Sequence, residues 1–93
     1  MQIKLSNDFK LNIEKSVVTD WRFVQAVAYS ESKDEIKRLK GVVELADVLL
    51  GDQKEDLMDK IAKDNNGAVP TEKVSEIISE IILKLKDEED TKK

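Results

Sequence analysis

The sequence predicts a mostly α protein, a small bundle of about four helices preceded by a short N-terminal β-hairpin. Four segments within residues 20–86 repeat apolar residues every three or four positions, which is the period of a helix. Residues 2–14 instead alternate between apolar and polar. Ninety-three residues, 40% of them apolar and 39% charged, leave material for only one core, so we expect a single domain over residues 1–86.

The hairpin is predicted over residues 2–14. A turn-prone Ser-Asn-Asp at positions 6–8 separates two runs with a period of two. The apolar members of these runs are Ile3, Leu5, Phe9, Leu11 and Ile13. Two strands cannot stand alone in water, so their apolar face must lie against helices.

A first helix is predicted over residues 20–30, with Thr19 as its N-cap and Asp20 at the positive end of the helix dipole. Apolar side chains cover more than half of its circumference. They form one stripe of Trp21, Val24 and Ala28, which Phe23, Val27 and Tyr29 widen.

A second helix is predicted over residues 33–50. Ser32 and Glu35 have the spacing of a capping box, in which each side chain binds a free backbone N–H near the helix start. Gly41 interrupts the helix, and we interpret it as a tolerated weakness or a close helix contact rather than as a hinge. One apolar stripe follows the helical period through Ile36, Leu39, Val43, Ala46 and Leu50, with Val42 and Leu49 beside it.

Two further helices are predicted over residues 53–63 and 72–86. Gly51 is suited to end the second helix, Asn65-Asn66-Gly67 to end the third, and Thr71 to cap the last. Residues 87–93 offer nothing apolar to bury and are expected to form a charged, disordered tail. The strongest periodic pattern of the chain lies in the last helix, at Val74, Ile77, Ile78, Ile81, Ile82 and Leu85.

Composition argues against catalysis, cofactors and metals. The chain has no Cys and no His, which removes thiol nucleophiles, the commonest general base and the usual zinc ligands. A calcium loop with Gly67 as its invariant glycine fails, because Ala62 would occupy the first ligand position and Lys73 the position of the bidentate glutamate. We therefore expect no enzyme.

Charge and hydropathy argue against nucleic acid and membranes. The net charge is −4, and the one basic run, Lys37-Arg38-Lys40, is interleaved with acidic residues. No apolar run is longer than four residues, and the start lacks the pattern of a signal peptide. We expect a cytoplasmic protein.

Surplus apolar surface is the candidate functional feature. The last helix carries more large aliphatic residues than a small core needs, although ordinary core packing would also explain them. A leftover surface would form a groove or an oligomer seam that receives an amphipathic helix, with aromatic residues as anchors. The candidate contact residues are Trp21, Phe23, Val27, Val74, Ile77, Ile78, Ile81, Ile82 and Leu85. A chain this short also favours a homo-oligomer.

The order of segments along nearly the whole chain resembles a family of small phage proteins. An alternating N-terminal segment is followed by Asp20-Trp21-Arg22-Phe23-Val24, a helix closing on Leu49-Leu50-Gly51, then Asn66-Gly67-Ala68-Val69-Pro70 and an Ile-rich helix. This pattern is similar to the tail assembly chaperones of long, non-contractile-tailed phages of Gram-positive bacteria. Its motifs are short, and none is a catalytic signature.

The resemblance implies a non-enzymatic protein that coats the tape measure protein until tail-tube subunits replace it. It implies the host cytoplasm as the place of action, absence from the finished virion, and the tail-tube protein as a further partner. In this family a frameshift near the end of the gene often yields a longer product, and Lys92-Lys93 is compatible with a slippery codon run. The alternative is a small acidic adaptor or regulatory module that binds a host or phage protein.

Overall fold

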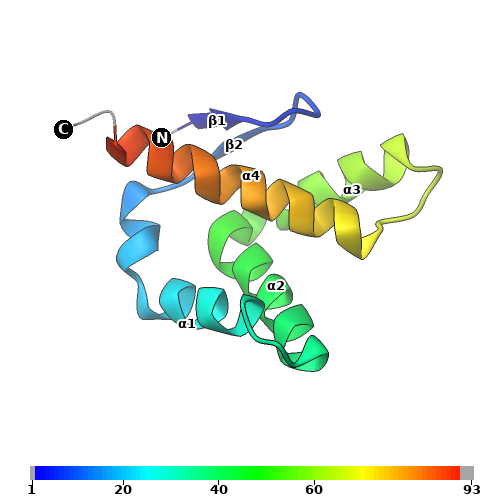
Figure 1. The fold of residues 1–93 in the computed structure, drawn as a ribbon. Coiled ribbons are helices and arrows are strands. Elements are labelled where there is room, and N and C mark those ends of the chain that lie inside the picture. The colour runs from blue at the N-terminus through cyan, green and yellow to red at the C-terminus, as the bar shows by residue number, and fades with distance from the viewer. Residues whose placement is uncertain (1, 91–93) are drawn as a thin grey trace.

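The described part of the protein is mostly α, with four α-helices and an N-terminal hairpin, as predicted. The structure, a computed structural model, describes residues 2–90, and side chains through Lys86. Figure 1 shows the hairpin lying along the last helix. In chain order the elements are β1 (Gln2–Lys4), β2 (Lys10–Asn12), the 3-10 helix η1 (Lys15–Thr19), α1 (Trp21–Ser30), α2 (Glu35–Leu50), the 3-10 helix η2 (Gly51–Gln53), α3 (Lys54–Asp64) and α4 (Thr71–Asp90).

The hairpin pairs antiparallel, with Ile3 opposite Leu11. Its turn is closed by the Leu5 N–H, which donates to the Phe9 carbonyl at 2.8 Å. Asp8 takes a positive φ of 72° in this turn, a conformation that Asp tolerates better than most residues. Side chains alternate across a strand, so the predicted apolar residues share one face, which α4 covers (Figure 1).

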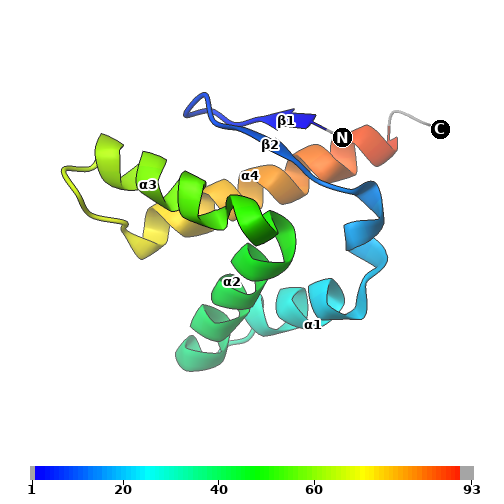
Figure 2. The same ribbon diagram turned by 180° about the vertical axis from the view of Figure 1, so that it is seen from behind.

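The helices form two groups. α3, α4 and the hairpin lie together, while α1 packs beside α2, whose first half projects away from α3 and α4; the view from behind in Figure 2 shows the same arrangement. Only the C-terminal half of α2 therefore reaches the main core. That core joins apolar side chains from both strands and all four helices: Ile3, Leu5, Leu11, Ile13, Phe23, Ala26, Leu45, Ala46, Leu49, Leu50, Leu57, Ile61, Ile78, Ile81 and Leu85.

The first two helices are capped by Asp rather than by the hydroxyl residues that the sequence predicted. Asp20 accepts from the Arg22 N–H at 2.8 Å, whereas Thr19 is the last residue of η1 and donates to the Ser16 carbonyl. Asp34 accepts from two N–H groups of the first turn of α2, while Ser32 accepts only from the Asp34 N–H. In both cases a carboxylate one or two residues nearer the helix outcompetes the hydroxyl, because it also complements the helix dipole.

The later helix boundaries differ from the predictions by a few residues. α2 ends at Leu50, and Gly51 follows with a φ of 50°, as its predicted role requires. α4 begins at Thr71 and continues to Asp90 instead of ending at residue 86. Residues 87–90 contain no Gly or Pro to interrupt the helix, so the predicted disorder is wrong for them. Residues 91–93 of the predicted tail lie outside the described residues.

Polar side chains fasten the hairpin to the helices. Glu80 accepts hydrogen bonds from the N–H and the hydroxyl of Ser6, at 2.8 and 3.0 Å. Lys84, one turn further along α4, donates to the Lys4 carbonyl. The Gln53 amide donates to the Asn12 carbonyl and accepts from the Asn12 N–H, both at 2.8 Å. These contacts fix both strands against the helical body.

Gly41 lies where α2 crosses the end of α1. A Cβ at this position would be 2.7 Å from both Ser30 Cα and Tyr29 C, which are backbone atoms. The interpretation of Gly41 as a close helix contact is therefore correct. Only glycine lets the two helices approach this closely.

Candidate interaction surfaces

Most of the predicted contact residues belong to the core or its border. Phe23, Ile78, Ile81 and Leu85 are buried, which corrects the expectation that they offer a surface to a partner. The hairpin and the C-terminal end of α2 pack against the apolar residues of α4 that the sequence suggested were surplus. Val27, Val74, Ile77 and Ile82 are partly buried and pack against the core. Trp21 is the one predicted residue that is largely exposed, at 73%.

The first half of α2 presents an apolar stripe to solvent. Ile36, Leu39 and Val43 are 79, 45 and 61% exposed. They have the spacing i, i+3 and i+7, so they lie on one face of the helix. The same face continues into Ala46 and Leu50, which are buried. This set of three exposed residues is called the α2 stripe below.

The α2 stripe opens into a groove bounded by α2, α3 and the start of α4. The groove has a volume of ≈ 480 Å³ and is called the α2 groove below. Asp47 and Lys54 form an ion pair in its wall, and the hydrogen bond and charge of Asp47 raise the pKa of Lys54 above its ordinary value. The remaining lining is mostly apolar: Leu39, Val42, Val43, Ala46, Met58, Val69, Thr71 and Val74.

A second exposed stripe lies on α1. Trp21, Val24 and Ala28 are exposed, whereas Phe23 and Ala26 on the opposite side of the helix are buried. We call these three residues the α1 stripe. The sequence showed that α1 is apolar over more than half of its circumference, and the structure divides that circumference into a buried and an exposed half.

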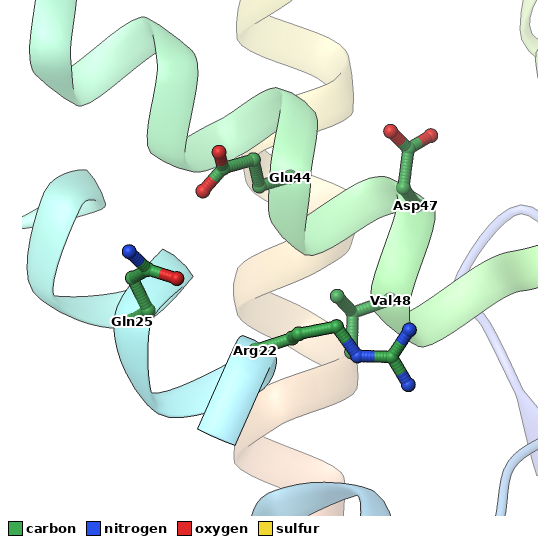
Figure 3. A pocket seen from close by; sticks show the side chains of 5 residues that line it. All are labelled: Arg22, Gln25, Glu44, Asp47 and Val48. Atoms are coloured by element: carbon green, nitrogen blue, oxygen red, sulfur yellow. The ribbon is translucent and has the colours of Figure 1, made fainter. Parts of the chain in front are cut away.

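A polar cleft lies between α1 and α2. Figure 3 shows Arg22 and Gln25 from α1 beside Glu44, Asp47 and Val48 from α2. Arg22 is paired with Asp20 at 3.1 Å, and its side-chain and backbone hydrogen bonds hold the pKa of Asp20 below its ordinary value. Asp47 is paired with Lys54. Two of the charged groups at this cleft therefore already have partners within the chain.

Comparisons with known proteins do not assign this chain to a family. No family model, curated protein or solved structure matches this chain. Within residues 2–90 the structure contains no helix that is both long and apolar enough to span a membrane. It also contains no group of three or more acidic side chains placed to hold a metal ion, as far as the side chains are described. The two apolar stripes and the α2 groove are thus the features from which a function can be argued.

Sequence reasoning found the α2 stripe as part of a longer apolar pattern but did not include it among the candidate contact residues. Periodicity reveals which residues share a face, and it does not reveal what covers that face. Val69, which lines the α2 groove, carried a weaker signal: it precedes Pro70, and residues before proline are extended rather than helical.

Proposed function

We propose that this protein is a non-enzymatic phage tail assembly chaperone that binds and solubilises the tape measure protein before tail-tube polymerisation. It acts in the host cytoplasm and is absent from the finished virion. The observation that carries the proposal is the exposed α2 groove, which is open and mostly apolar. The resemblance of the segment order to this chaperone family supports the choice of client.

The α2 groove suits an amphipathic helix. Helices that bind in grooves insert apolar residues spaced by three or four positions, and the α2 stripe presents apolar residues at the same spacing. Leu39, Met58 and Val74, from three different helices, line the groove and would contact the apolar face of such a client. The Asp47–Lys54 pair would face its polar edge. A tape measure protein awaiting assembly exposes many segments of this kind.

Release without an energy source requires each contact to be weak. The α2 groove is open and small, so one copy buries little of its client. Several copies along one long helical client gain strength from multivalency, while each copy still dissociates readily. Tail-tube subunits can then replace the copies one at a time.

Co-expression with the tape measure protein of the same genome tests the proposal. We expect a soluble complex with the natural protein and loss of copurification with Val43→Asp, which places a carboxylate in the apolar groove. Leu83→Asp is the matched control, because Leu83 is 60% exposed and lies on α4 outside the α2 groove. A tape measure protein that stays insoluble with the natural protein would refute the proposal, as would equal loss with both variants.

A further inference from the structure

Exposed basic side chains gather at the start of α2. Residues 33–40 hold four basic and two acidic residues, so this segment has a charge of +2 in a chain with a net charge of −4. All six charged side chains are exposed. One of the acidic residues, Asp34, is occupied as the N-cap of the helix, where it accepts from two backbone N–H groups. The basic residues are Lys33, Lys37, Arg38 and Lys40.

These four cations form no ion pair with any side chain that the structure describes. The ion pairs of the described part of the chain lie on the hairpin, at the start of α1, between the second half of α2 and α3, and along α3 and α4. Lys40 Nζ lies 5.3 Å from the centre of the Tyr29 ring, a cation–π contact that does not neutralise its charge. The four cations can therefore attract acidic groups from outside the chain.

Lysines border one edge of the α2 stripe. Residues three or four positions apart are neighbours on the surface of a helix. Lys40 follows Ile36 by four residues and precedes Val43 by three, so it lies beside both. Lys37 lies one turn before Lys40 along the same edge. A helix that packs on the stripe therefore meets two ammonium groups along this edge.

The opposite edge of the stripe is acidic. Glu35 precedes Leu39 by four residues and lies beside it. Lys40 follows Glu35 by five residues, which is a rotation of about 140° around the helix. The stripe thus lies between a lysine edge and a glutamate edge.

An amphipathic protein helix fits this surface better than a membrane or a nucleic acid. The net charge of −4 opposes the approach of the whole chain to an anionic bilayer, and a flat lipid surface leaves the α2 groove of ≈ 480 Å³ unfilled. Nucleic acid would use the lysines and leave the apolar stripe exposed to water. A helix with both apolar and acidic side chains complements the stripe and the lysine edge together.

We propose that the α2 groove selects helices that carry acidic residues along one flank of their apolar face, the flank that lies beside Lys37 and Lys40. Glu35 disfavours a second acidic flank. This inference rests on the proposed function, because it names the kind of tape measure segment that the groove binds. The apolar contact can hold even where the selection by charge fails, so the two are tested separately.

Two unlike edges also set the direction of the bound helix. Turning a helix end for end, while its apolar face stays on the stripe, exchanges its two flanks. A client with one acidic flank then places its carboxylates beside Glu35 instead of beside the lysines. Each such client is therefore bound preferentially in one direction along α2.

Designed helical peptides test the selection. Four peptides share one apolar face with i, i+3, i+7 spacing, and their flanking positions carry Glu on one flank, Gln on that flank, Lys on that flank, or Glu on both flanks. Fluorescence anisotropy measures the Kd of each peptide for the full chain. We expect the peptide with Glu on one flank to bind about fivefold more tightly than the Gln peptide, because it forms two exposed ion pairs.

The remaining peptides and the salt concentration complete the test. The Lys peptide should bind most weakly, and the peptide with Glu on both flanks should bind no more tightly than the peptide with Glu on one flank. Raising the salt concentration to about 0.5 M should remove most of these differences, because exposed charges are screened.

Charge reversal on the protein should reverse the preference. In the double variant Lys37→Glu/Lys40→Glu we expect the Lys peptide to bind more tightly than the Glu peptide. Lys10→Glu/Lys63→Glu is the matched control, because it has the same net charge and its sites are outside the α2 groove. All four sites are exposed, so both variants should keep the natural circular dichroism spectrum. Should the first variant lose that spectrum, the salt dependence of the natural protein decides instead.

Several outcomes would overturn the selection. Equal Kd values of the natural protein for the Glu, Gln and Lys peptides would show that the groove does not discriminate by charge. An equal change of order in the control variant would reduce the preference to net charge. Tighter binding of the peptide with two acidic flanks would refute the role of Glu35. A natural protein that sediments with phosphatidylglycerol vesicles and binds no peptide would assign the lysines to a membrane surface.

Val43→Asp separates this failure from failure of the proposed function. If the peptides bind the natural protein with equal Kd values and Val43→Asp abolishes their binding, the groove binds helices and only the selection by charge fails. If no peptide binds and the tape measure protein does not copurify, the proposed function fails as well.

Discussion

Gly41 is the residue that sets the distance between α1 and α2. Glycine inside a helix normally costs stability relative to alanine, by about 1 kcal/mol. Here the missing side chain admits the backbone of Tyr29 and Ser30, which no rotamer change can move aside. Close packing of the two helices therefore depends on the residue that looks weakest in the sequence.

We predict that Gly41→Ala destabilises the protein, against the usual effect of this substitution in a helix. The added Cβ forces α1 away from α2, and such overpacking typically costs about 1–3 kcal/mol. Urea unfolding followed by circular dichroism measures the change. Ser79→Ala, at an exposed position of α4, is the control and should lie within about 0.5 kcal/mol of the natural protein. A stabilised Gly41→Ala would show that the helices do not approach this closely.

The start of α2 provides a second prediction at the scale of single residues. Asp34 accepts from the N–H groups of Ile36 and Lys37, so Asp34→Ala should lower the free energy of unfolding by about 1 kcal/mol. Ser32→Ala removes one hydrogen bond outside the helix and should cost less than half as much. The two variants can be compared in one series of thermal unfolding curves. A larger loss of stability from Ser32→Ala than from Asp34→Ala would show that Ser32 is the N-cap.

Among the elements, the hairpin depends most on contacts far along the chain. β1 and β2 have three residues each, too few to be stable alone. Their apolar face rests on the helices, and Glu80 holds the turn through Ser6. Alternation of apolar residues was enough to predict the strands. The polar fastening was not predictable, because Ser6 and Glu80 are 74 residues apart and nothing local connects them.

We predict that Glu80→Ala loosens the hairpin more than it loosens the helices. It removes two hydrogen bonds to a carboxylate on the protein surface, and we expect a loss of about 1 kcal/mol. Hydrogen exchange should show faster exchange of the Leu5 and Ser6 amides, with little change in α2 and α3. Glu76→Ala, one turn earlier on α4, removes only an exposed ion pair with Lys73 and should leave the hairpin unchanged. Equally faster exchange of these amides in both variants would mean that Glu80 does not hold the turn.

At the scale of the whole molecule, the position of α2 decides which apolar residues remain exposed. The stripe from Ile36 to Leu50 is continuous in the sequence, yet only Ala46 and Leu50 are covered. Coverage depends on where α3 and α4 cross α2, and a helical period contains no information about that crossing. The number and type of elements could therefore be predicted. How each apolar face is divided between core and surface could not be predicted.

The apolar face of α4 shows the same limit of prediction from sequence. Ile78, Ile81 and Leu85 looked like surplus because a small bundle has limited room. The hairpin supplies the missing partner surface through Ile3, Leu5, Leu11 and Ile13, which complete the core. The surplus apolar surface lies instead on α1 and α2, whose periodic patterns are weaker than that of the last helix.

The paired hydrogen bonds between Gln53 and Asn12 have a consequence for how copies of this protein can meet. An exposed strand edge invites a strand from another chain and starts uncontrolled sheet growth. The Gln53 amide presents one donor and one acceptor to β2, as a neighbouring strand would, and so occupies part of that edge. The part of the β2 edge that Gln53 occupies is therefore closed to amyloid-like stacking with a strand of another chain.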